Sequence, residues 1–125
     1  MSNIKALQWR YAVKKFDEKK ILPESKVDIL KQAFNLTATS YGLQPIRLVV
    51  VKNKELQESL KEKAMNQVQL STASHVLVIC IEDNVDKEFI LNYFERVKQI
   101  RETPDEILDP FKNFLLEDFG NKSNE

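Results

Sequence analysis

At 125 residues the chain can form one compact domain, and its composition, 42% apolar and 30% charged, is ordinary for a globular protein. Nineteen basic residues balance nineteen acidic ones, so no strong positive field favours nucleic acid or an anionic membrane as a partner. One cysteine and one histidine exclude an internal disulfide and a multi-histidine or cysteine-rich metal site, and two glycines are too few for a glycine-rich phosphate loop.

No segment predicts a membrane span or a secretion signal. The longest apolar run, Val76 to Ile81, is too short to cross a bilayer. The N-terminal stretch of residues 1–5 lacks the apolar centre of a secretory signal. We therefore expect a cytoplasmic protein.

The first two predicted elements are helices. The first spans residues 3–11, with Ser2 or Asn3 as its cap. After a polar connection, a second helix begins near Pro23, whose missing N–H costs nothing in a first turn, and ends near Ala38. Its buried face is predicted by apolar residues at helical spacing: Val27, Leu30 and Phe34.

Two strands are predicted, at residues 46–52 and 76–81. The first is rich in β-branched residues, and the second is apolar at every position, which predicts a central strand covered on both faces. Between them we expect a helix capped by Asn53, followed by an irregular turn and a short helix in residues 65–72. The predicted inner face of the capped helix consists of Leu56, Leu60 and Ala64.

The second predicted strand is followed by two more helices, at residues 86–100 and 104–119, and Pro110 is expected to kink or divide the last one. Two strands are too few for a stable sheet. We therefore expect that other segments pair with them, that a partner chain does so, or that the chain is incomplete. The last helix also presents apolar surface suited to a partner, at Phe111, Phe114 and Phe119.

Two segments carry residue types that suit a planar anionic cofactor. Arg10 and Lys14 are four residues apart, a spacing that places both cations on one side of a helix end. Residues 36–45 combine small side chains and hydroxyls with Gly42, which lets backbone amides approach a flat ring closely. Taken singly, cations near helix ends are usually solvated and interact favourably with the helix dipole.

Together these segments resemble the flavin-binding half of the nitroreductase family, FMN-dependent enzymes that use a nicotinamide donor. Asn66 and residues 73–75 fit the same pattern, and the resemblance spans roughly residues 5–120. It implies an α+β protein with a three-layer α/β/α sandwich, a mixed or mostly antiparallel sheet, and a homodimer with the flavin at its interface. The order strand–helix–strand alone would predict a parallel crossover.

The resemblance also assigns roles to individual residues. Arg10 would face the FMN phosphate, and Lys14 the pyrimidine edge of the ring, where a cation stabilises negative charge on the reduced flavin. Asn66 would reach the polar edge of the ring, and Gln69 stands where some members have lysine. The predicted FMN-binding residues are Arg10, Tyr11, Ala12, Lys14, Ala38, Thr39, Ser40, Gly42, Gln44, Asn66 and Gln69.

Further positions are assigned to the nicotinamide donor or the acceptor. Tyr41 is expected either near the ring face, where the two substrates take turns, or packed on the protein core. Arg101 matches a basic residue near the nicotinamide or the acceptor. No acid–base catalytic residue and no metal are expected. The predicted nicotinamide and substrate contacts are Lys14, Tyr41, Asn66 and Arg101.

The resemblance covers only the first half of a nitroreductase. Family members continue with an apolar dimer helix, further strands and a basic pair that clamps the FMN phosphate, so we expect a truncated chain or part of a longer protein. The function it implies is hydride transfer from NAD(P)H through FMN to nitroaromatic, quinone or similar acceptors, by a ping-pong mechanism. Two alternatives stay open: a non-catalytic remnant that binds no flavin, and an α/β interaction domain that uses the phenylalanine-rich last helix.

Overall fold

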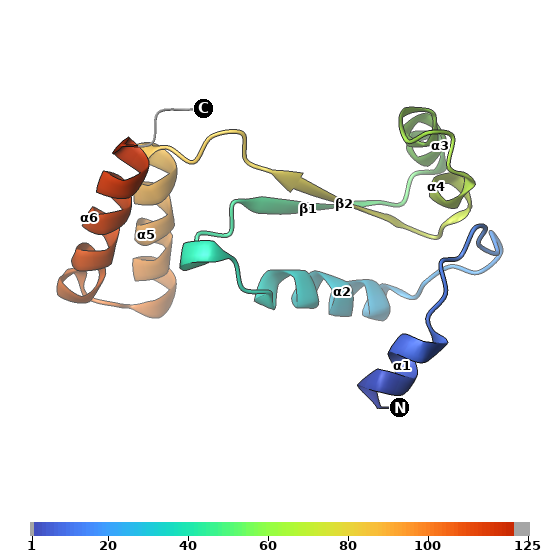
Figure 1. Ribbon diagram of the computed structural model, residues 1–125, viewed down its shortest axis with the longest axis horizontal. Coiled ribbons are helices and arrows are strands. Elements are labelled where there is room, and N and C mark those ends of the chain that lie inside the picture. The colour runs from blue at the N-terminus through green and yellow to red at the C-terminus, as the bar shows by residue number, and fades with distance from the viewer. Residues whose placement is uncertain (1, 122–125) are drawn as a thin grey trace. The chain divides into compact units, whose positions relative to one another are not determined.

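The computed structural model describes residues 2–121 (Figure 1). These residues divide into two compact units, the first comprising residues 2–36 and 48–79 and the second residues 37–47 and 80–121. The elements are α1 (Asn3–Trp9), α2 (Glu24–Leu36), the short 3-10 helix η1 (Ser40–Gly42), β1 (Ile46–Val51), α3 (Lys54–Lys63), α4 (Val68–Thr72), β2 (Val76–Ile81), α5 (Lys87–Arg101) and α6 (Asp105–Asn121).

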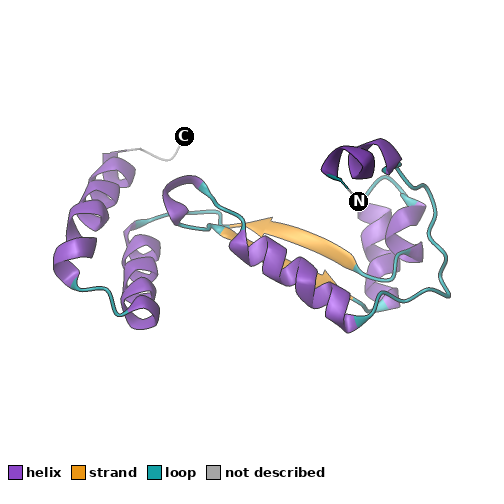
Figure 2. Cartoon of the chain, turned by 90° about the horizontal axis from the view of Figure 1, so that it is seen from below, coloured by secondary structure: helices purple, strands orange, loops and turns teal. Residues whose placement is uncertain are grey.

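The strands β1 and β2 form a two-stranded antiparallel sheet (Figure 2). The N–H of Glu82, just after β2, donates to the carbonyl of Pro45, just before β1, at 3.0 Å. Only strands that run in opposite directions join the start of one to the end of the other. The antiparallel arrangement implied by the resemblance is therefore confirmed, and the parallel crossover that strand order alone predicts is wrong.

The prediction that β2 lies in the centre of a sheet, covered on both faces, was wrong. Among the described residues β2 pairs with β1 alone. Alternate side chains of a strand point to opposite faces, and one face of β2 is exposed at Leu77, Ile79 and Ile81. An unbroken apolar run indicates a strand, but it does not show how many neighbours cover that strand.

The helix α2 follows Pro23, as predicted, and ends at Leu36, two residues before the expected end. The carbonyl of Pro23 accepts hydrogen bonds from the N–H groups of Lys26 and Val27 and so begins the helix. Of the predicted apolar face only Val27 is buried. Phe34 is half-buried, and Leu30 is 40% exposed. The periodicity located the helix correctly and overestimated how much of its apolar face is covered.

The helix α3 makes polar contacts with the end of β1 and with the segment that precedes β2. Gln57 is fully buried, and its Nε2 donates to the carbonyl of Val51 at 3.0 Å. Nζ of Lys54 donates to Oε1 of Gln57 at 2.8 Å and to the carbonyl of Ala73. The predicted inner face placed Leu56 here, yet Leu56 is 49% exposed. Hydrogen bonds offset the desolvation of the amide, which is why a polar residue occupies the buried position.

The second unit has an apolar core between α5 and α6. Its buried residues are Leu43, Ile90, Phe94 and Leu115. The helix α6 is continuous from Asp105 to Asn121 and includes Pro110. Of the two expected effects of the proline, division of the helix does not occur. Around the core lie the partly buried side chains of Val85, Phe89, Tyr93, Leu108, Leu116 and Phe119.

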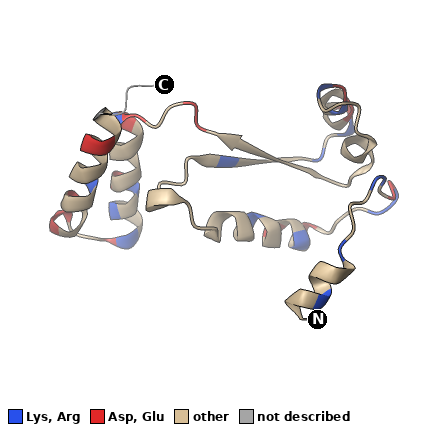
Figure 3. Ribbon diagram, viewed as in Figure 1, with Lys and Arg blue, Asp and Glu red and all other residues tan. Residues whose placement is uncertain are grey.

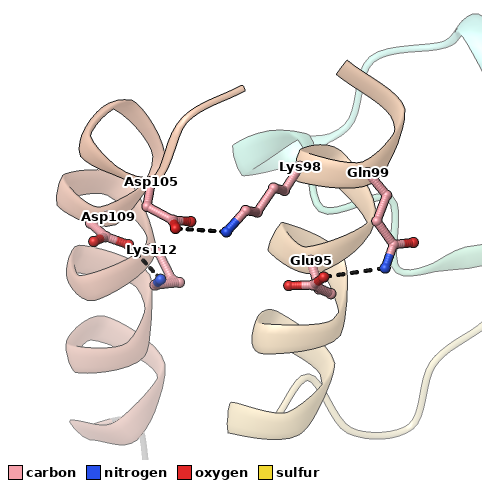
Figure 4. Close-up of polar contacts among 6 residues, drawn as sticks. All are labelled: Glu95, Lys98, Gln99, Asp105, Asp109 and Lys112. Carbon is pink, nitrogen blue, oxygen red and sulfur yellow. Dashed lines mark hydrogen bonds and ion pairs between the residues drawn. The ribbon is translucent and has the colours of Figure 1, made fainter. Parts of the chain in front are cut away.

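An exposed ion pair links α5 to the start of α6 (Figure 4). Nζ of Lys98 lies 2.6 Å from Oδ2 of Asp105; this hydrogen bond raises the pKa of Lys98 and lowers the pKa of Asp105. Solvent screens such surface pairs, so the apolar core contributes more to the stability of this unit. Within residues 2–121, no helix is both long enough and apolar enough to cross a membrane.

We expect Gln57→Leu to lower the free energy of unfolding by roughly 1–3 kcal/mol, because the buried Val51 carbonyl and the Lys54 ammonium each lose a hydrogen-bond partner. Leu56→Ala is the control, because its half-exposed side chain should cost less than about 1 kcal/mol. Urea titrations followed by circular dichroism measure both. Equal losses in the two variants would contradict a stabilising role for the hydrogen bonds of Gln57.

Candidate functional site

The helical argument for Arg10 and Lys14 was wrong. The helix α1 ends at Trp9, and Arg10 is its C-cap, with extended backbone (φ −59°, ψ 142°). Beyond it the N–H of Val13 donates to the carbonyl of Tyr11 at 3.0 Å, which closes a tight turn. The two cations therefore lie on irregular backbone after the helix, where a four-residue spacing does not place them on one side.

Both cations are nevertheless available to a ligand. Arg10 and Lys14 are exposed, and neither side chain forms a hydrogen bond or an ion pair with another residue in 2–121. Tyr11 and Ala12 are exposed as well. Figure 3 shows only basic residues (blue) along α1 and the chain that follows it, with acidic residues (red) appearing in the connection to α2.

The segment that leads into β1 has strained backbone. Tyr41, Gly42 and Gln44 have φ angles of 55°, 71° and 49°, in the left-handed region. Oγ1 of Thr39 accepts a hydrogen bond from the N–H of Gln44 at 2.9 Å, which closes the loop. A non-glycine residue in this region costs about 1–2 kcal/mol, so the surrounding structure must impose the conformation.

Packing within the second unit, to which this segment belongs, supplies that constraint. Leu43 is buried in the core between α5 and α6. The ring centroid of Tyr41 lies 6.4, 6.2 and 6.1 Å from those of Phe111, Phe114 and Phe119, mostly at steep interplanar angles. Of the two expectations for Tyr41, the structure shows packing on α6, and the side chain keeps 41% of its surface exposed.

A second strained position surrounds Asn66. Met65 and Asn66 follow α3 with φ angles of 53° and 55°, and the N–H of Asn66 donates to the carbonyl of Lys61 at 3.1 Å. The side-chain amides of Asn66 and of Gln69, in α4, form no hydrogen bond with another described residue. Sequence reasoning identified Asn66 but missed Met65, which is 85% exposed beside it. Nothing in the sequence pattern marks a left-handed methionine.

The predicted site residues are divided between the two units. The first unit contains Arg10, Tyr11, Ala12, Lys14, Asn66 and Gln69, and the second contains Ala38, Thr39, Ser40, Tyr41, Gly42, Gln44 and Arg101. Arg101 is the exposed last residue of α5. Within the first unit, the N–H of Phe16 donates to Oγ1 of Thr72 at 3.1 Å, which ties the chain after Lys14 to the end of α4. The two cations and the two side-chain amides without partners among the described residues thus belong to the same unit. Their hydrogen-bond donors suit an anionic planar ligand.

A largely apolar cavity of about 400 Å³ lies in the same unit, between the connection that precedes α2 and the entrance to β2. The half-buried pair Ser74 and His75 borders it, with 2.7 Å between Oγ and Nδ1, and Oγ of Ser74 accepts a hydrogen bond from the N–H of Leu22 at 2.8 Å. None of the predicted cofactor residues lines this cavity. Its lining consists of Phe16, Asp17, Lys20, Ile21, Leu22, Pro23, Ala73, Ser74, His75 and Leu77.

Residues 7–113 match the sequence profile of the Nitroreductase family. The chain is 36% identical over 115 residues to a candidate NAD(P)H nitroreductase of Staphylococcus haemolyticus, a match that covers 89% of this chain and 53% of that protein. The chain therefore spans about half the length of such relatives.

Solved structures agree with this match. A nitroreductase-like protein from Streptococcus mutans has a TM-score of 0.74 and 28% identity, over 94% of this chain and 56% of that one. A candidate nitroreductase from Exiguobacterium sibiricum, crystallised in complex with FMN, has a TM-score of 0.73 and 20% identity, over 98% and 59%. The predicted nitroreductase-like fold is thereby confirmed for about half of such a chain.

We expect Gly42→Ala to lower the free energy of unfolding by about 1–2 kcal/mol, because a side chain is disfavoured at φ +71°. The added Cβ would meet the Tyr93 hydroxyl at an ordinary 3.5 Å, so the cost is backbone strain and not a clash. Gly120→Ala, in α6 with open space around it, is the control and should stabilise by up to about 1 kcal/mol. Thermal unfolding of both variants tests this, and a neutral Gly42→Ala would refute the strain.

Proposed function

The chain belongs to the nitroreductase family, and from this premise we propose that it acts as an FMN-dependent oxidoreductase. The proposed reaction transfers a hydride from NAD(P)H to nitroaromatic, quinone or similar electron-poor acceptors. The observation that carries the proposal is that one unit contains the cations Arg10 and Lys14 and the side-chain amides of Asn66 and Gln69. None of these groups has a partner among the residues that the structure describes. The named activity of the S. haemolyticus relative and the FMN in the E. sibiricum structure support the choice of donor and cofactor.

The residues present fit FMN by the chemistry of their donors. The guanidinium of Arg10 can donate two parallel hydrogen bonds to the phosphate, and Lys14 provides a compact positive charge at the pyrimidine edge of the ring. Asn66 and Gln69 offer amide donors and acceptors to the polar edge. FMN, when bound, supplies the capacity to accept a hydride and pass it on.

Residues of the second unit complete the proposed site. We assign Ala38, Thr39 and Ser40, with Gly42 and Gln44, to contacts with the flavin held by another copy of the chain, in a homodimer. The exposed part of Tyr41 and the guanidinium of Arg101 would border the space shared by nicotinamide and acceptor. The cytoplasm, where reduced nicotinamide is plentiful, is the proposed location.

The chain's own part in the proposed reaction would be to position the cofactor and the two substrates and to stabilise the reduced ring. The side chain of Lys14 would oppose negative charge on the reduced ring, which would lower the free energy of the reduced, FMN-loaded protein. No described residue is assigned the transfer of a proton. One binding space would serve the donor and then the acceptor, because both must reach the same ring face.

Lys14→Met is expected to weaken FMN binding about tenfold or more, because a hydrogen bond to a charged group contributes about 1.5–3 kcal/mol. Reduction by NAD(P)H should slow in parallel. The control is Lys15→Met, which removes the same charge one residue later. Quenching of FMN fluorescence by the full chain measures the affinity. If FMN affinity and reduction rate were both unchanged in Lys14→Met, its assigned role would be withdrawn.

Steady-state kinetics test the shared binding space. With NAD(P)H varied at several fixed acceptor concentrations, we expect parallel double-reciprocal lines, since the donor product leaves before the acceptor binds. Intersecting lines would contradict the shared space. A colourless preparation that takes up no FMN would contradict the proposed cofactor altogether.

A further inference from the structure

We propose that Thr72 is a positioning residue that holds the cation segment, residues 10–14, in place relative to the amide segment, residues 66–69. The consequence for FMN rests on the function proposed above. The holding role itself rests on contacts within the first unit. Thr72 was not among the residues predicted from the sequence.

The hydroxyl of Thr72 is both a hydrogen-bond donor and a hydrogen-bond acceptor. It donates to the carbonyl of Val68 at 2.9 Å, one turn earlier in α4, and it accepts the N–H of Phe16 at 3.1 Å. Thr72 is only 4% exposed. Loss of this oxygen would leave the N–H of Phe16 without its partner in a partly buried place, which is costly.

The hydrogen bond between Phe16 and Thr72 lies close in sequence to both the cation segment and the amide segment. Phe16 is two residues beyond Lys14, so an extended chain separates their Cα atoms by at most about 7 Å. Gln69 precedes Thr72 by three residues in α4, which is about 4.5 Å along the helix axis and on a neighbouring part of its surface. The hydrogen bond between Phe16 and Thr72 therefore lies near Lys14 of the cation segment and near Gln69 of the amide segment.

The N-terminal side of this contact has little else to hold it. Every residue from 2 to 20 is exposed, so no buried side chain anchors α1 or the turn that follows it. The α4 side is firmly held, because Lys54 Nζ donates to the carbonyls of Ser71, at 3.2 Å, and Ala73, on either side of Thr72. A segment without buried anchors next to a fixed one takes its position from the hydrogen bonds between them.

Ser71 provides a matched control. Its hydroxyl donates to the same Val68 carbonyl, at 3.2 Å, but makes no bond to Phe16. Ser71→Ala therefore removes a hydroxyl from the same helix end and leaves the link to Phe16 intact. Thr72→Val removes the link while keeping the shape of the side chain, and Thr72→Ser restores the hydroxyl.

The experiment compares these three variants with the unaltered full chain in two measurements. Hydrogen–deuterium exchange of peptides that cover residues 10–20 reports the holding role without any flavin. Titration of FMN, followed by fluorescence, reports its consequence. We expect Thr72→Val to speed exchange in residues 10–20 and weaken FMN binding about fivefold to tenfold, whereas Thr72→Ser and Ser71→Ala stay close to the unaltered chain.

The outcomes separate this inference from the proposed function. Unchanged exchange in Thr72→Val overturns the holding role, and so does faster exchange that Thr72→Ser fails to reverse. Faster exchange with unchanged FMN affinity overturns the positioning role. If the unaltered chain takes up no FMN, the proposed function fails, and the exchange data alone decide for or against the holding role. Urea titrations identify any variant whose exchange reflects global unfolding.

Discussion

Hydrogen bonds to residues 71–75 hold the first unit together. In this unit Val27 and Val51 are the only buried apolar residues among those described, so burial of hydrocarbon contributes less than is usual for a domain. Lys54 and Gln57 on α3 donate to carbonyl groups of residues 71–74, while the hydroxyls of Thr72 and Ser74 accept hydrogen bonds from N–H groups of the connection that precedes α2. Such bonds are directional, and a buried partner left unpaired is costly. They specify one arrangement where apolar packing alone would allow several.

The second unit shows the opposite balance. Its apolar core between α5 and α6 includes Leu43, and the phenylalanines of α6 surround Tyr41. That packing explains how Tyr41 and Gln44 keep left-handed backbone conformations. Among residues 2–121, five non-glycine residues have positive φ, and three of them, Tyr41, Gln44 and Asn66, are residues assigned to the cofactor or substrate site. Strain concentrated in this way is typical of binding segments that a surrounding structure holds ready.

Most helices and strands were predictable because local signals specify them. The side chains of Asn53 and Asp86 cap α3 and α5, and each accepts the backbone N–H three residues later. The bounds of β2 agree with its apolar run. Burial was predicted less well, as the exposure of Leu56 and Ile79 shows. Periodicity reveals which residues share a face, but whether another element covers that face depends on contacts between distant parts of the chain.

The sequence by itself determined the family and the chemical identity of the candidate site, because cations, amides and hydroxyls occur at recognisable positions in the chain. Only the tertiary structure decided how those groups are held. It placed Arg10 and Lys14 beyond the end of α1, turned Tyr41 onto α6, and joined Phe16 to Thr72 across 56 residues. Helix caps and strand patterns are local and can be read from neighbouring residues. A hydrogen bond between residues so far apart depends on how the intervening chain folds, and no local pattern encodes it.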